Sequence, residues 1–600
     1  MCGIFGFTVK VNDQRGVLEK MGKAMIHRGP DGEGYFHTEE IAMGMRRLSI
    51  IDLENGDQPF YSKDRSVVAF CNGEIYNYKA LRELLRSKGC QFETNSDIEV
   101  LPNLFQEYGI DFVKKLNGMF AISIFDQKTQ KLYLVRDHLG IKPLYYSLTS
   151  EGIIYSSEIR PMLTLNKISL EVNYKALSSY LDLMYIPRPM SPFQQIAKLD
   201  SGSYMVFDGK DFSISKYWDL ELGTTGDVGE ASAEIEELLK ESIQSQLVSD
   251  VPIGSFLSGG VDSSYVSAVA ADFSKDSFSA FHMRWGDIPG KIDESKYAEQ
   301  VADQYGINKV FKDVNNLDVL ELIPRLLYSL EEPFSDAAFI PTYFLANLAS
   351  KEVKVILSGA GGDELFGGYP HHRTYPKFRS LAAQLLYDRN KAASYFDRWK
   401  RGSGKYWKGL FPWYKKNSFK EPFEKKFKEN RHIDEVNAAM LGDIDHYLQD
   451  NILFLTDKMT MAASLECRVP LLDYRVVEKA QLIGSDAKIV GGETKAMLKK
   501  IAESYVPKEV LYRQKEGFGF PIEKWINEHK DLYFDPLMEN GYMVSNNLIS
   551  QKGLNRFVLE KTLGRDDSWF YWQVIVLEIW FQLFVEGTHY KDVFELPYKR

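Results

Sequence analysis

The chain has 600 residues, of which 44% are hydrophobic, 26% are charged and 13% are aromatic. Because this length exceeds what one hydrophobic core usually supports, we expect two or more globular domains. The formal net charge of −10 argues against nucleic acid as the main partner, since binding to phosphates requires a basic surface. No run of 18 apolar residues occurs, so no membrane span is expected.

The cysteines and the amino terminus favour a cytoplasmic protein. No CxxC pair and no metal-ligand spacing connects the four cysteines, which fits free thiols in a reducing compartment. These are Cys2, Cys71, Cys90 and Cys467. The amino terminus, MCGIFGF, has no basic leader and no cleavage region, so no secretory signal is expected. Cys2 is in an unusual place because it directly follows the initiator methionine.

Short strands separated by turns are predicted for residues 1 to about 160. The expected strands cover residues 2–9, 66–73, 119–126 and 131–137, and the last two are joined by a QKTQ hairpin loop. One helix, over residues 96–109, begins with a capping box of Ser96 and Glu99. Runs of strands with few helices are typical of antiparallel sheets that pack against each other.

A change of pattern predicts the domain boundary. The stretch 207–230 is polar and rich in Gly, Asp and turn signals, so we expect domains over 1–210 and 231–600. In the second domain, helices alternate with short apolar strands that end in glycine-rich turns, which is typical of a parallel α/β sheet with ligands at the carboxyl ends of its strands. The last hundred residues are expected to be mostly helical, with the aromatic stretch 569–584 in the core.

Cys2 could supply both a nucleophile and a base. Removal of Met1 would leave Cys2 with a free α-amine, whose reference pKa is about 8. A thiol attacks only as the thiolate, and near neutral pH it needs a neighbouring base. The α-amine lies within reach of its own side chain and can accept that proton. Without companions, however, a cysteine at this position is more commonly a small buried residue in a first strand.

Residues that suit a substrate with a carboxylate and an ammonium group follow Cys2 along the chain. The arginines of the RRLSIIDL motif suit a substrate α-carboxylate, which a guanidinium binds through two parallel hydrogen bonds. In the NGEIYN motif, the Asn72 amide and the Gly73 N–H group could stabilise the oxyanion of a tetrahedral intermediate. Glu74 and Asp97 can bind a substrate ammonium group.

These motifs, in this order, resemble the glutaminase domain of class II glutamine amidotransferases, the amino-terminal-nucleophile type. The match consists of MCGIFGF, HRGPD, RRLSIID, NGEIYN and NSD, and it runs through residues 1 to about 160. The resemblance implies a four-layer α/β/β/α sandwich. It implies the following roles: nucleophile, Cys2; glutamine carboxylate site, Arg47; oxyanion hole, Asn72 and Gly73; α-amino site, Glu74 and Asp97.

A glycine-rich loop, SGGVDSS, lies between an expected strand within 250–257 and a small-residue helix over 264–273. Its backbone N–H groups and hydroxyls could bind phosphate, and the helix N-terminus adds positive potential. No Lys-Ser/Thr pair follows the glycines, so the loop is not a Walker A motif and does not indicate transfer of a γ-phosphoryl group. It resembles the pyrophosphate loop of enzymes that split ATP into AMP and pyrophosphate.

A second acidic loop, SGAGGDELFGGY, follows an expected strand over 353–359. Asp262 and Asp363 lie at the ends of two strands that should meet across the sheet, and paired carboxylates suit Mg²⁺ bound to ATP phosphates. Lys495 and Lys515 are candidates to neutralise pyrophosphate and the charge at an adenylated carboxylate. Taken singly, Asp363 could be a simple helix cap, and each lysine would more often be a surface residue.

Together with the DKMTMAASLECRVPLLD motif, these loops resemble the synthetase domain of the asparagine synthetase family, which also includes the β-lactam synthetases. The resemblance then covers almost the whole chain. It implies ATP as a substrate, Mg²⁺ as a cofactor and a homodimer. It implies these site residues: for ATP, Leu257, Ser258, Gly259, Gly260, Asp262, Ser263, Ser358, Gly359 and Lys495; for Mg²⁺, Asp262 and Asp363; for the adenylate, Lys515.

One position departs from the asparagine synthetase pattern. Those enzymes usually have SGEG, with a glutamate thought to help deprotonate the incoming ammonia, whereas this chain has SGAG with Ala360. Alanine can neither accept a proton nor bind ammonium. Either another group is the base, with Glu364, His371 and His372 as candidates, or the acceptor is not aspartate. The turn YPHHR at 369–373 could then contact the acceptor, with an ordinary helix-terminal turn as the plain alternative.

The leading hypothesis is a glutamine-dependent amide ligase that acts on small molecules. One site would release ammonia from glutamine, and the other would adenylate a carboxylate with ATP and amidate it. The acceptor is aspartate, giving asparagine, or another carboxylate such as a sugar uronic acid. Intramolecular closure, as in β-lactam synthetases, is less favoured because those enzymes generally lack the nucleophilic cysteine. A non-catalytic binding module would be recognised by loss of Cys2, Asp262 or Asp363, and all three are present.

Overall fold

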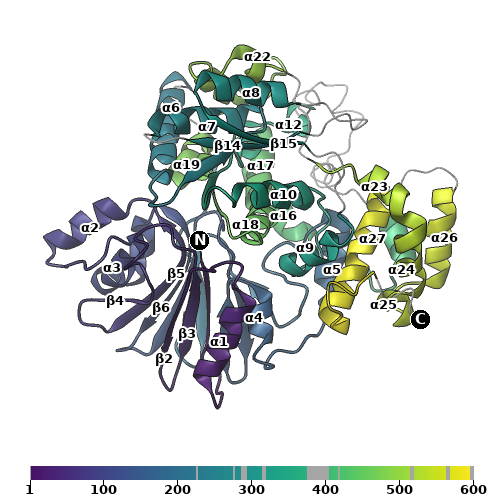
Figure 1. Cartoon of the computed structure of the whole chain (residues 1–600), viewed down its shortest axis with the longest axis horizontal. Helices are drawn as coiled ribbons and strands as arrows, with labels where there is room; N and C mark the ends of the chain where they lie inside the picture. The colour runs from purple at the N-terminus through teal and green to yellow at the C-terminus, as the bar shows by residue number, and fades with distance from the viewer. Residues whose placement is uncertain are drawn as a thin grey trace.

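An amino-terminal sandwich of two sheets, a parallel-sheet domain and a helical carboxyl-terminal part make up the computed structural model (Figure 1). The amino terminus lies between the sandwich and the parallel-sheet domain, and the carboxyl terminus lies in the helical part. The structure describes residues 2–223, 228–274, 278–284, 294–313, 319–374, 404–416, 419–513, 519–562 and 568–594.

Two six-stranded antiparallel sheets form the sandwich. The first has the strand order β10-β8-β9-β1-β3-β2, and the second has the order β12-β11-β7-β6-β5-β4. The strands are β1 Gly3–Phe7, β2 Gly32–His37, β3 Ala42–Arg47, β4 Phe60–Tyr61, β5 Val67–Ile75, β6 Gly118–Asp126, β7 Lys131–Arg136, β8 Tyr145–Thr149, β9 Gly152–Ser156, β10 Ala197–Lys198, β11 Ser203–Phe207 and β12 Phe212–Lys216. The hairpin predicted at QKTQ joins β6 to β7.

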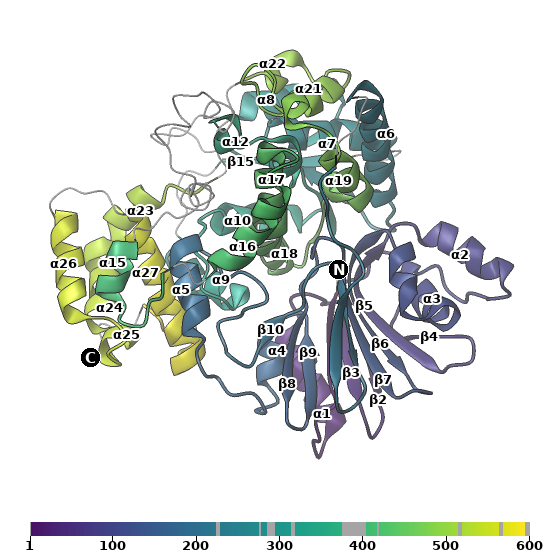
Figure 2. The same ribbon diagram turned by 180° about the vertical axis from the view of Figure 1, so that it is seen from behind.

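Helices cover the outer faces of both sheets. On the first sheet, α1 (Gln14–Ala24) packs on β1, β2 and β3, and α4 (Ile159–Leu163) packs on β9. On the second, α3 (Val100–Tyr108) packs on β4 and β5, and α2 (Tyr78–Ser87) packs on α3. Figure 2 shows these layers from behind. The α/β/β/α sandwich is therefore confirmed.

Side chains of β5 alternate between the two cores of the sandwich. Val68 and Phe70 are buried between the sheets, together with Ile4 of the facing sheet. Ala69 and Cys71 point the other way, into the core beneath α3. Successive side chains of a strand point to opposite faces, so a strand that is covered on both faces is apolar throughout. This double burial explains the unbroken apolar run of the predicted strand.

The helix predicted over 96–109 forms, but it begins differently. A 3-10 turn, η1 (Asp97–Glu99), precedes α3. Ser96 caps this turn, because its Oγ accepts a hydrogen bond from the N–H group of Ile98 (3.3 Å). The carboxylate of Glu99 instead accepts backbone N–H groups of the loop before it (2.8 and 3.0 Å). The reciprocal bond of a capping box is absent among the described residues because this loop takes up the glutamate.

The first sheet-rich region extends past residue 210. β12 pairs with β11 from Ser203↔Lys216 to Phe207↔Phe212, so the amino-terminal sandwich reaches Lys216. The next described element is α6 (Val228–Gln246), which packs against elements of the parallel-sheet domain. The domain limits 1–210 and 231–600 stay predictions.

A five-stranded parallel sheet with the order β15-β14-β13-β16-β17 forms the core of the second domain. Its strands are β13 Ile253–Phe256, β14 Ser279–Arg284, β15 Asn308–Asp313, β16 Val355–Leu357 and β17 Glu466–Arg468. The chain runs outward from β13 to β15 and then crosses back to β16, so the strand order reverses between β13 and β16. Ligands of open α/β sheets bind at such a switch point.

Helices surround this sheet, and further helices make up the carboxyl-terminal part of the chain that the structure describes. Those of the domain are α6, α7 Val261–Phe273, α8 Ser295–Gln304, α9 Leu322–Leu330, α10 Phe339–Ala349, α11 Gly362–Phe366, α12 Pro370–Thr374, α16 Lys420–Asn430, α17 Glu435–Gly442, the π-helix η4 Asp443–Leu453, α18 Phe454–Met461, η5 Pro470–Leu472, α19 Tyr474–Gln481, α20 Ser485–Lys488, α21 Ala496–Ala502 and α22 Lys508–Leu511. The helical part contains α15 Gly404–Leu410, α23 Ile522–His529, η6 Lys530–Phe534, α24 Asp535–Asn540, α25 Tyr542–Ser545, α26 Gln551–Thr562, α27 Ser568–Phe581 and η7 Gln582–Glu586.

The aromatic stretch near the carboxyl terminus is a core helix. Ser568–Glu586 is, among the described residues, the helix long and apolar enough to cross a membrane, and 83% of its apolar window is buried inside the protein. It packs against α9 and α23. Helix α5 (Tyr174–Leu183) lies beside it (Figure 1), and the Tyr180 hydroxyl donates to the carbonyl of Gln573 (2.7 Å). The prediction of a helical carboxyl-terminal part is confirmed.

Candidate active sites of the two domains

Cys2 lies at the start of β1, at the junction of the two domains. Its backbone nitrogen donates to Asn72 Oδ1 (3.1 Å), and its carbonyl oxygen accepts from Arg28 Nε (3.1 Å). Burial raises the pKa of the Cys2 thiol, although the backbone N–H of Leu48 and the charge of Arg47 act in the opposite direction. The thiol therefore needs a base at neutral pH.

The predicted oxyanion residues lie beside Cys2 on β5. Gly73 has φ +146, and a Cβ there would lie 1.9 Å from the carbonyl oxygen of Met119, so only glycine fits. Asn72 is fully buried, and its Nδ2 lies 3.4 Å from Ser157 Oγ. The contact of Asn72 to the Cys2 nitrogen places the Asn72 side chain beside the predicted nucleophile, and Gly73 follows Asn72 on β5.

Arg47 is held by the loop that follows β3. Its guanidinium donates to Asp57 Oδ1 (2.8 Å) and to the carbonyl oxygens of Ile51 (3.0 Å) and Asp52 (2.6 Å). These bonds fix the direction of the side chain at the end of β3, one residue before the Leu48 N–H that contacts the Cys2 thiol. A fixed guanidinium suits bidentate binding of a carboxylate.

Two buried carboxylates lie at the far end of β5. Asp97 Oδ2 accepts a hydrogen bond from the Ile75 N–H group (2.8 Å), and burial raises the pKa of Asp97 to about 6. Burial also raises the pKa of Glu74, aided by the nearby Glu466 and opposed by Arg468. Carboxylates whose ionised form is disfavoured in this way gain most from a cation such as an ammonium group.

Arg468 of the second domain reaches the residues that are predicted to bind glutamine, a contact that the sequence did not indicate. This fully buried residue ends β17, and its Nη2 lies 3.2 Å from Glu74 Oε2, while its Nε donates to Glu466 (2.7 Å). Its carbonyl oxygen accepts the N–H group of Ser358 (2.9 Å), at the end of β16. Arg468 therefore contacts Glu74, which is predicted to bind glutamine, and Ser358, which is predicted to bind ATP. Its only sequence signal was its place in the DKMTMAASLECRVPLLD motif, to which no role was given.

Arg28 of the HRGPD motif also ties the two domains together. It is fully buried, and its guanidinium contacts Glu158 (3.2 Å) and Asp457 of α18 (2.7 Å) as well as the Cys2 carbonyl. Lys458 extends the network to Glu158 (3.3 Å). Removing one partner from such a buried network is expected to be costly, because it leaves an uncompensated charge.

The glycine-rich loops after β13 and β16 interlock at the switch point. Their strands pair in parallel, so the two strand ends lie side by side, as predicted. A Cβ at Gly359 would lie 2.6 Å from the nitrogen of Ser263, and one at Gly362 would lie 2.2 Å from Asp262 Oδ1. At Gly359 the second loop can therefore fold onto the start of α7 only with glycine, whereas a side chain at Gly362 would require the Asp262 carboxylate to move.

Lys495 lies between the two predicted metal ligands. Its Nζ lies 2.5 Å from Asp262 Oδ2 and 2.7 Å from Asp363 Oδ1. Burial opposes its charge, but the two carboxylates raise the pKa of Lys495, so it is a cation at neutral pH. Lys495 has φ 56, in the left-handed region that non-glycine residues rarely adopt, and such backbone often occurs at functional sites.

The residues present fit a divalent cation held by oxygen ligands. Asp262 Oδ1 is buried and has no hydrogen-bond partner among the described residues, so a carboxylate oxygen remains to be satisfied. Asp363 lies opposite, from the neighbouring strand end, and paired carboxylates are typical ligands of Mg²⁺ in nucleotide sites.

Hydroxyl groups shape the first glycine-rich loop. Ser258 and Ser263 hydrogen-bond each other through their side chains (2.9 Å), and Ser263 Oγ lies 3.1 Å from the Ser258 nitrogen. Leu257 precedes them, and Gly259 has φ +73. Arg513, which sequence reasoning missed, donates from Nε and Nη2 to the Gly259 carbonyl (3.1 and 2.8 Å). Lys515, two residues on, lies outside the described residues.

The candidates to replace the missing glutamate at Ala360 are all in defined places. Glu364 is buried on α11, it accepts a hydrogen bond from the Tyr369 hydroxyl, and burial with the neighbouring Asp363 raises its pKa to about 7. His371 and His372 both contact Asp443 instead of projecting freely. None of these contacts assigns the base.

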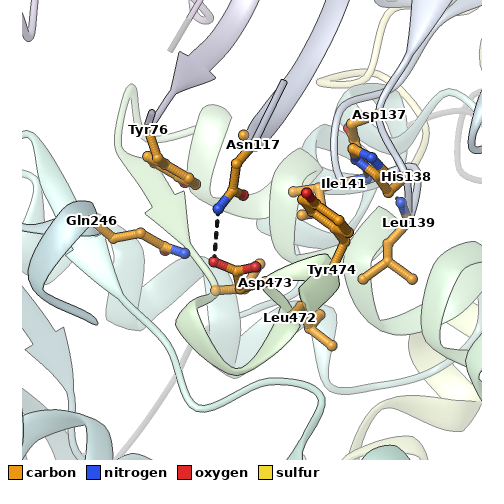
Figure 3. A pocket seen from close by; sticks show the side chains of 12 residues that line it. Tyr76, Asn117, Asp137, His138, Leu139, Ile141, Gln246, Leu472, Asp473 and Tyr474 are labelled. Carbon is orange, nitrogen blue, oxygen red and sulfur yellow. Dashed lines mark hydrogen bonds between the residues drawn. The ribbon is translucent and has the colours of Figure 1, made fainter. Parts of the chain in front are cut away.

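A small pocket lies at the domain interface (Figure 3). Asn117 Nδ2 donates to Asp473 Oδ2 across it (2.9 Å). The Tyr76 hydroxyl, His138 Nδ1 and Gln246 Oε1 are buried there without a hydrogen-bond partner among the described residues. Its volume of about 10 Å³ admits one molecule the size of water, which could satisfy these atoms.

Comparison with known proteins agrees with this architecture. The family profile described as "Asparagine synthase" matches residues 234–582, and the profile "Glutamine amidotransferase domain" matches residues 1–218. "Asparagine synthetase [glutamine-hydrolyzing] 1" of Bacillus subtilis is 33% identical over 98% of this chain and 98% of its own. "Putative asparagine synthetase [glutamine-hydrolyzing]" of Mycobacterium tuberculosis H37Rv is 30% identical over 100% and 99%.

More distant proteins are similar too. "Asparagine synthetase B [glutamine-hydrolyzing]" of Escherichia coli K12 is 28% identical over 89% of this chain and 84% of its own. A solved glutamine phosphoribosylpyrophosphate amidotransferase of Bacillus subtilis aligns over 60% of this chain and 82% of its own with a TM-score of 0.30 and 13% identity, which is too low to support an inference.

A glutamine amidotransferase domain joined to a parallel α/β synthetase domain defines the class of this protein, a glutamine-hydrolysing amidotransferase of the ligase type. Within that class, the chain belongs to the asparagine synthase family. The roles of the individual site residues stay predictions.

Proposed function

We propose that this chain releases ammonia from glutamine at Cys2 and uses ATP to convert a carboxylate into an amide at the switch point of its parallel sheet. Aspartate, giving asparagine, is the first candidate acceptor, as the names of the relatives suggest for those proteins. The observation that carries the proposal is Arg468, whose side chain contacts Glu74 and whose carbonyl binds the Ser358 nitrogen. This arrangement puts both predicted sites within reach of one residue.

The first half-reaction follows from the surroundings of Cys2. Once Met1 is removed, the α-amine of Cys2 takes the thiol proton, and the thiolate attacks the side-chain amide carbon of glutamine. The Asn72 amide and the Gly73 N–H group stabilise the oxyanion, and the protonated α-amine delivers its proton to the departing ammonia. Arg47 holds the substrate carboxylate, and Glu74 and Asp97 hold its ammonium group. Water then cleaves the thioester to glutamate and the free thiol.

The second half-reaction follows from the interlocked loops. A carboxylate oxygen of the acceptor attacks the α-phosphorus of ATP, and pyrophosphate leaves. The loop from Ser258 to Ser263 lies at the N-terminus of α7, where backbone N–H groups favour phosphate oxygens. Lys495 offers a permanent positive charge between Asp262 and Asp363 for the charge on pyrophosphate. Ammonia then displaces AMP from the acyl-adenylate, and the amide loses a proton.

Mg²⁺ would be held by Asp262 and Asp363 in this site. When bound, it would neutralise phosphate oxygens of ATP. Lys515 remains the proposed partner of the adenylate. A homodimer and a cytoplasmic location stay predictions.

A second acceptor class is favoured by one observation. Ala360 carries no carboxylate at the position where asparagine synthetases usually have a glutamate, and its nitrogen donates to Ser358 Oγ (3.3 Å). If that loss reflects a different substrate, the acceptor is a carboxylate such as a sugar uronic acid, and the product is a uronamide.

The proposal is tested by incubating the purified chain with ATP, Mg²⁺ and glutamine and following pyrophosphate release for each candidate acid. We expect AMP and pyrophosphate in equal amounts, together with one glutamate for each amide formed. Robust release with aspartate selects asparagine formation, whereas release with a uronic acid alone selects the second class. Formation of ADP and phosphate would contradict the adenylate mechanism.

A further inference from the structure

Two histidines and an aspartate meet beside the switch point, apart from the residues proposed to bind glutamine and ATP. His371 and His372 lie on the short helix α12, and Asp443 is the first residue of the π-helix η4. The Nε2 atoms of both rings approach one oxygen, Asp443 Oδ2, at 3.2 and 2.7 Å. The three potential ligand atoms all lie within 4.8 Å of one another.

We propose that His371, His372 and Asp443 form a binding site for a transition-metal dication of the Zn²⁺ type. Zn²⁺ binds imidazole nitrogen and carboxylate oxygen at about 2.0–2.2 Å, so two ligands of a tetrahedral site lie roughly 3.3 Å apart. The distances of 3.2 and 2.7 Å to Asp443 Oδ2 are close to that spacing. The atoms therefore lie close enough together for one metal to be bound by all three after small side-chain movements.

The ligand types separate this site from the one at Asp262 and Asp363. Imidazole suits Zn²⁺ and related transition metals, whereas a set made of carboxylates suits Mg²⁺. Two neutral imidazoles and one carboxylate carry a single negative charge, so the site offers partial neutralisation of a dication. The same chain would thus hold a hard cation with its nucleotide and a softer cation here.

The two rings are already fixed in direction. The ring of His371 stacks on that of Tyr369, with 5.4 Å between centroids and 15° between planes. The rings of His371 and His372 lie edge to face, with 4.4 Å between centroids. Side chains that are locked by packing hold a metal site with little loss of entropy on binding. The π-helical turn that begins at Asp443 is also of a kind that is frequent at functional sites.

Burial leaves the site open on one side. The side chains of His372 and Asp443 are 0% and 1% exposed, and that of His371 is 15% exposed. Two ligands are therefore buried in the interior, and His371 is the one of the three that is partly exposed to solvent. Water or an oxygen atom of a small ligand would fill the remaining coordination positions.

The same distances fit two ring N–H groups that donate to one carboxylate oxygen without any metal, and an experiment separates the two. Co²⁺ serves as the probe, because it replaces Zn²⁺ and its visible absorption reports the ligands. The full chain carries Cys2→Ala, so that no amino-terminal thiol binds the probe, and Mg²⁺ is present in excess to occupy sites made of carboxylates alone.

We expect one Co²⁺ per chain in this background. His371→Ala should weaken binding at least about tenfold, and Asp443→Asn, which keeps the shape of the side chain, should weaken it similarly. His529→Ala is the matched control, since His529 lies on α23 and its ring contacts the carbonyl of Trp525; its affinity should equal that of the background. Circular dichroism and gel filtration are used to check that each variant is folded.

Two results would overturn the proposal. One is the absence of stoichiometric Co²⁺ binding to the Cys2→Ala chain. The other is binding to folded His371→Ala and Asp443→Asn with the affinity of the background. The assay does not depend on amide formation, so its outcome is separate from that of the proposed ligase activity.

Discussion

The two sites of this chain are built in different ways. The residues proposed to act on glutamine come from the first hundred residues, on β1 and β3 of one sheet, on β5 of the facing sheet and on the turn before α3. Cys2, Asn72, Arg47 and Asp97 are held by hydrogen bonds within the sandwich, whereas Glu74 also contacts Arg468 of the second domain. The synthetase residues come from three segments far apart in the sequence, and Lys495 occupies the place between the two aspartates. The first group of residues is fixed mainly by local hydrogen bonds, whereas in the second group Lys495 would have to move if Asp262 and Asp363 bind a cation as proposed.

The strongest test of the difference removes the nucleophile. Cys2→Ala should lower glutamine hydrolysis by about 10³-fold or more, because the thiol that forms the covalent intermediate is gone. Amide formation from added ammonium salts should persist, since the synthetase residues are untouched. The measurement is glutamate release alongside pyrophosphate release. Glutamine hydrolysis that survives in a clean preparation would refute the assignment.

The converse test disables the second site alone. Asp363→Asn should lower pyrophosphate formation about 10²-fold or more, because Asp363, which is both a partner of Lys495 and a proposed metal ligand, loses its charge. Hydrolysis of glutamine at Cys2 should continue. Ser350→Ala is a matched control on the same domain, since Ser350 is half-buried at the end of α10 and its hydroxyl donates to the Asn347 carbonyl of that helix. Equal losses of pyrophosphate formation and glutamine hydrolysis would contradict the assignment of the two reactions to separate sites.

Arg468 probes the contact between the sites. Arg468→Lys keeps a positive charge but loses the forked guanidinium that reaches Glu74, Glu466 and two carbonyl oxygens. We expect KM for glutamine to rise roughly tenfold, while ammonia-dependent synthesis changes less than threefold. Lys354→Ala, which removes an exposed interdomain pair with Asp31, is the control. A loss of ammonia-dependent synthesis as large as that of glutamine use would indicate a structural effect.

The raised pKa of Asp97 predicts how glutamine use depends on pH. Because that pKa is about 6, the carboxyl is ionised above pH 6 and protonated below it. The ammonium group of glutamine needs the ionised form, so kcat/KM for glutamine should fall roughly tenfold from pH 6.5 to pH 5. Ammonia-dependent synthesis, corrected for the ammonia present, should lack this acid limb. Asp97→Asn should weaken glutamine use at all pH values and flatten the limb.

Sequence reasoning reached the local parts of both sites and missed their connections. Gly73 and Gly359 lie in short motifs, and each is dictated by a backbone contact that motif spacing reflects, whereas Gly362 is limited by the side chain of Asp262. Arg28 and Arg468 act through partners hundreds of residues away, and no pattern within one sequence pairs them with Asp457 or Glu74.

The same limit applies to the fold. The antiparallel sandwich and the parallel sheet were predictable as types of sheet, because the period of the apolar residues and the glycine-rich turns are local signals. These signals indicated only that the strand ends before Asp262 and Asp363 meet, and they set no order for the strands of the sheet. The predicted capping box was wrong because backbone N–H groups of the loop just before Glu99 bind its carboxylate instead.

The smallest expected effect concerns Ala360. If aspartate is the acceptor, Ala360→Glu should leave the rate of asparagine formation unchanged or raise it severalfold, because a carboxylate near the acyl-adenylate could take a proton from ammonia. If the acceptor is a larger carboxylate, the added side chain should lower turnover, since the loop that carries Ala360 is tightly packed against the start of α7. Steady-state kinetics of both forms with aspartate and with a uronic acid separate these cases. Robust turnover of aspartate by the natural chain would refute the altered acceptor outright, because the missing glutamate would then be dispensable for the chemistry it is thought to serve.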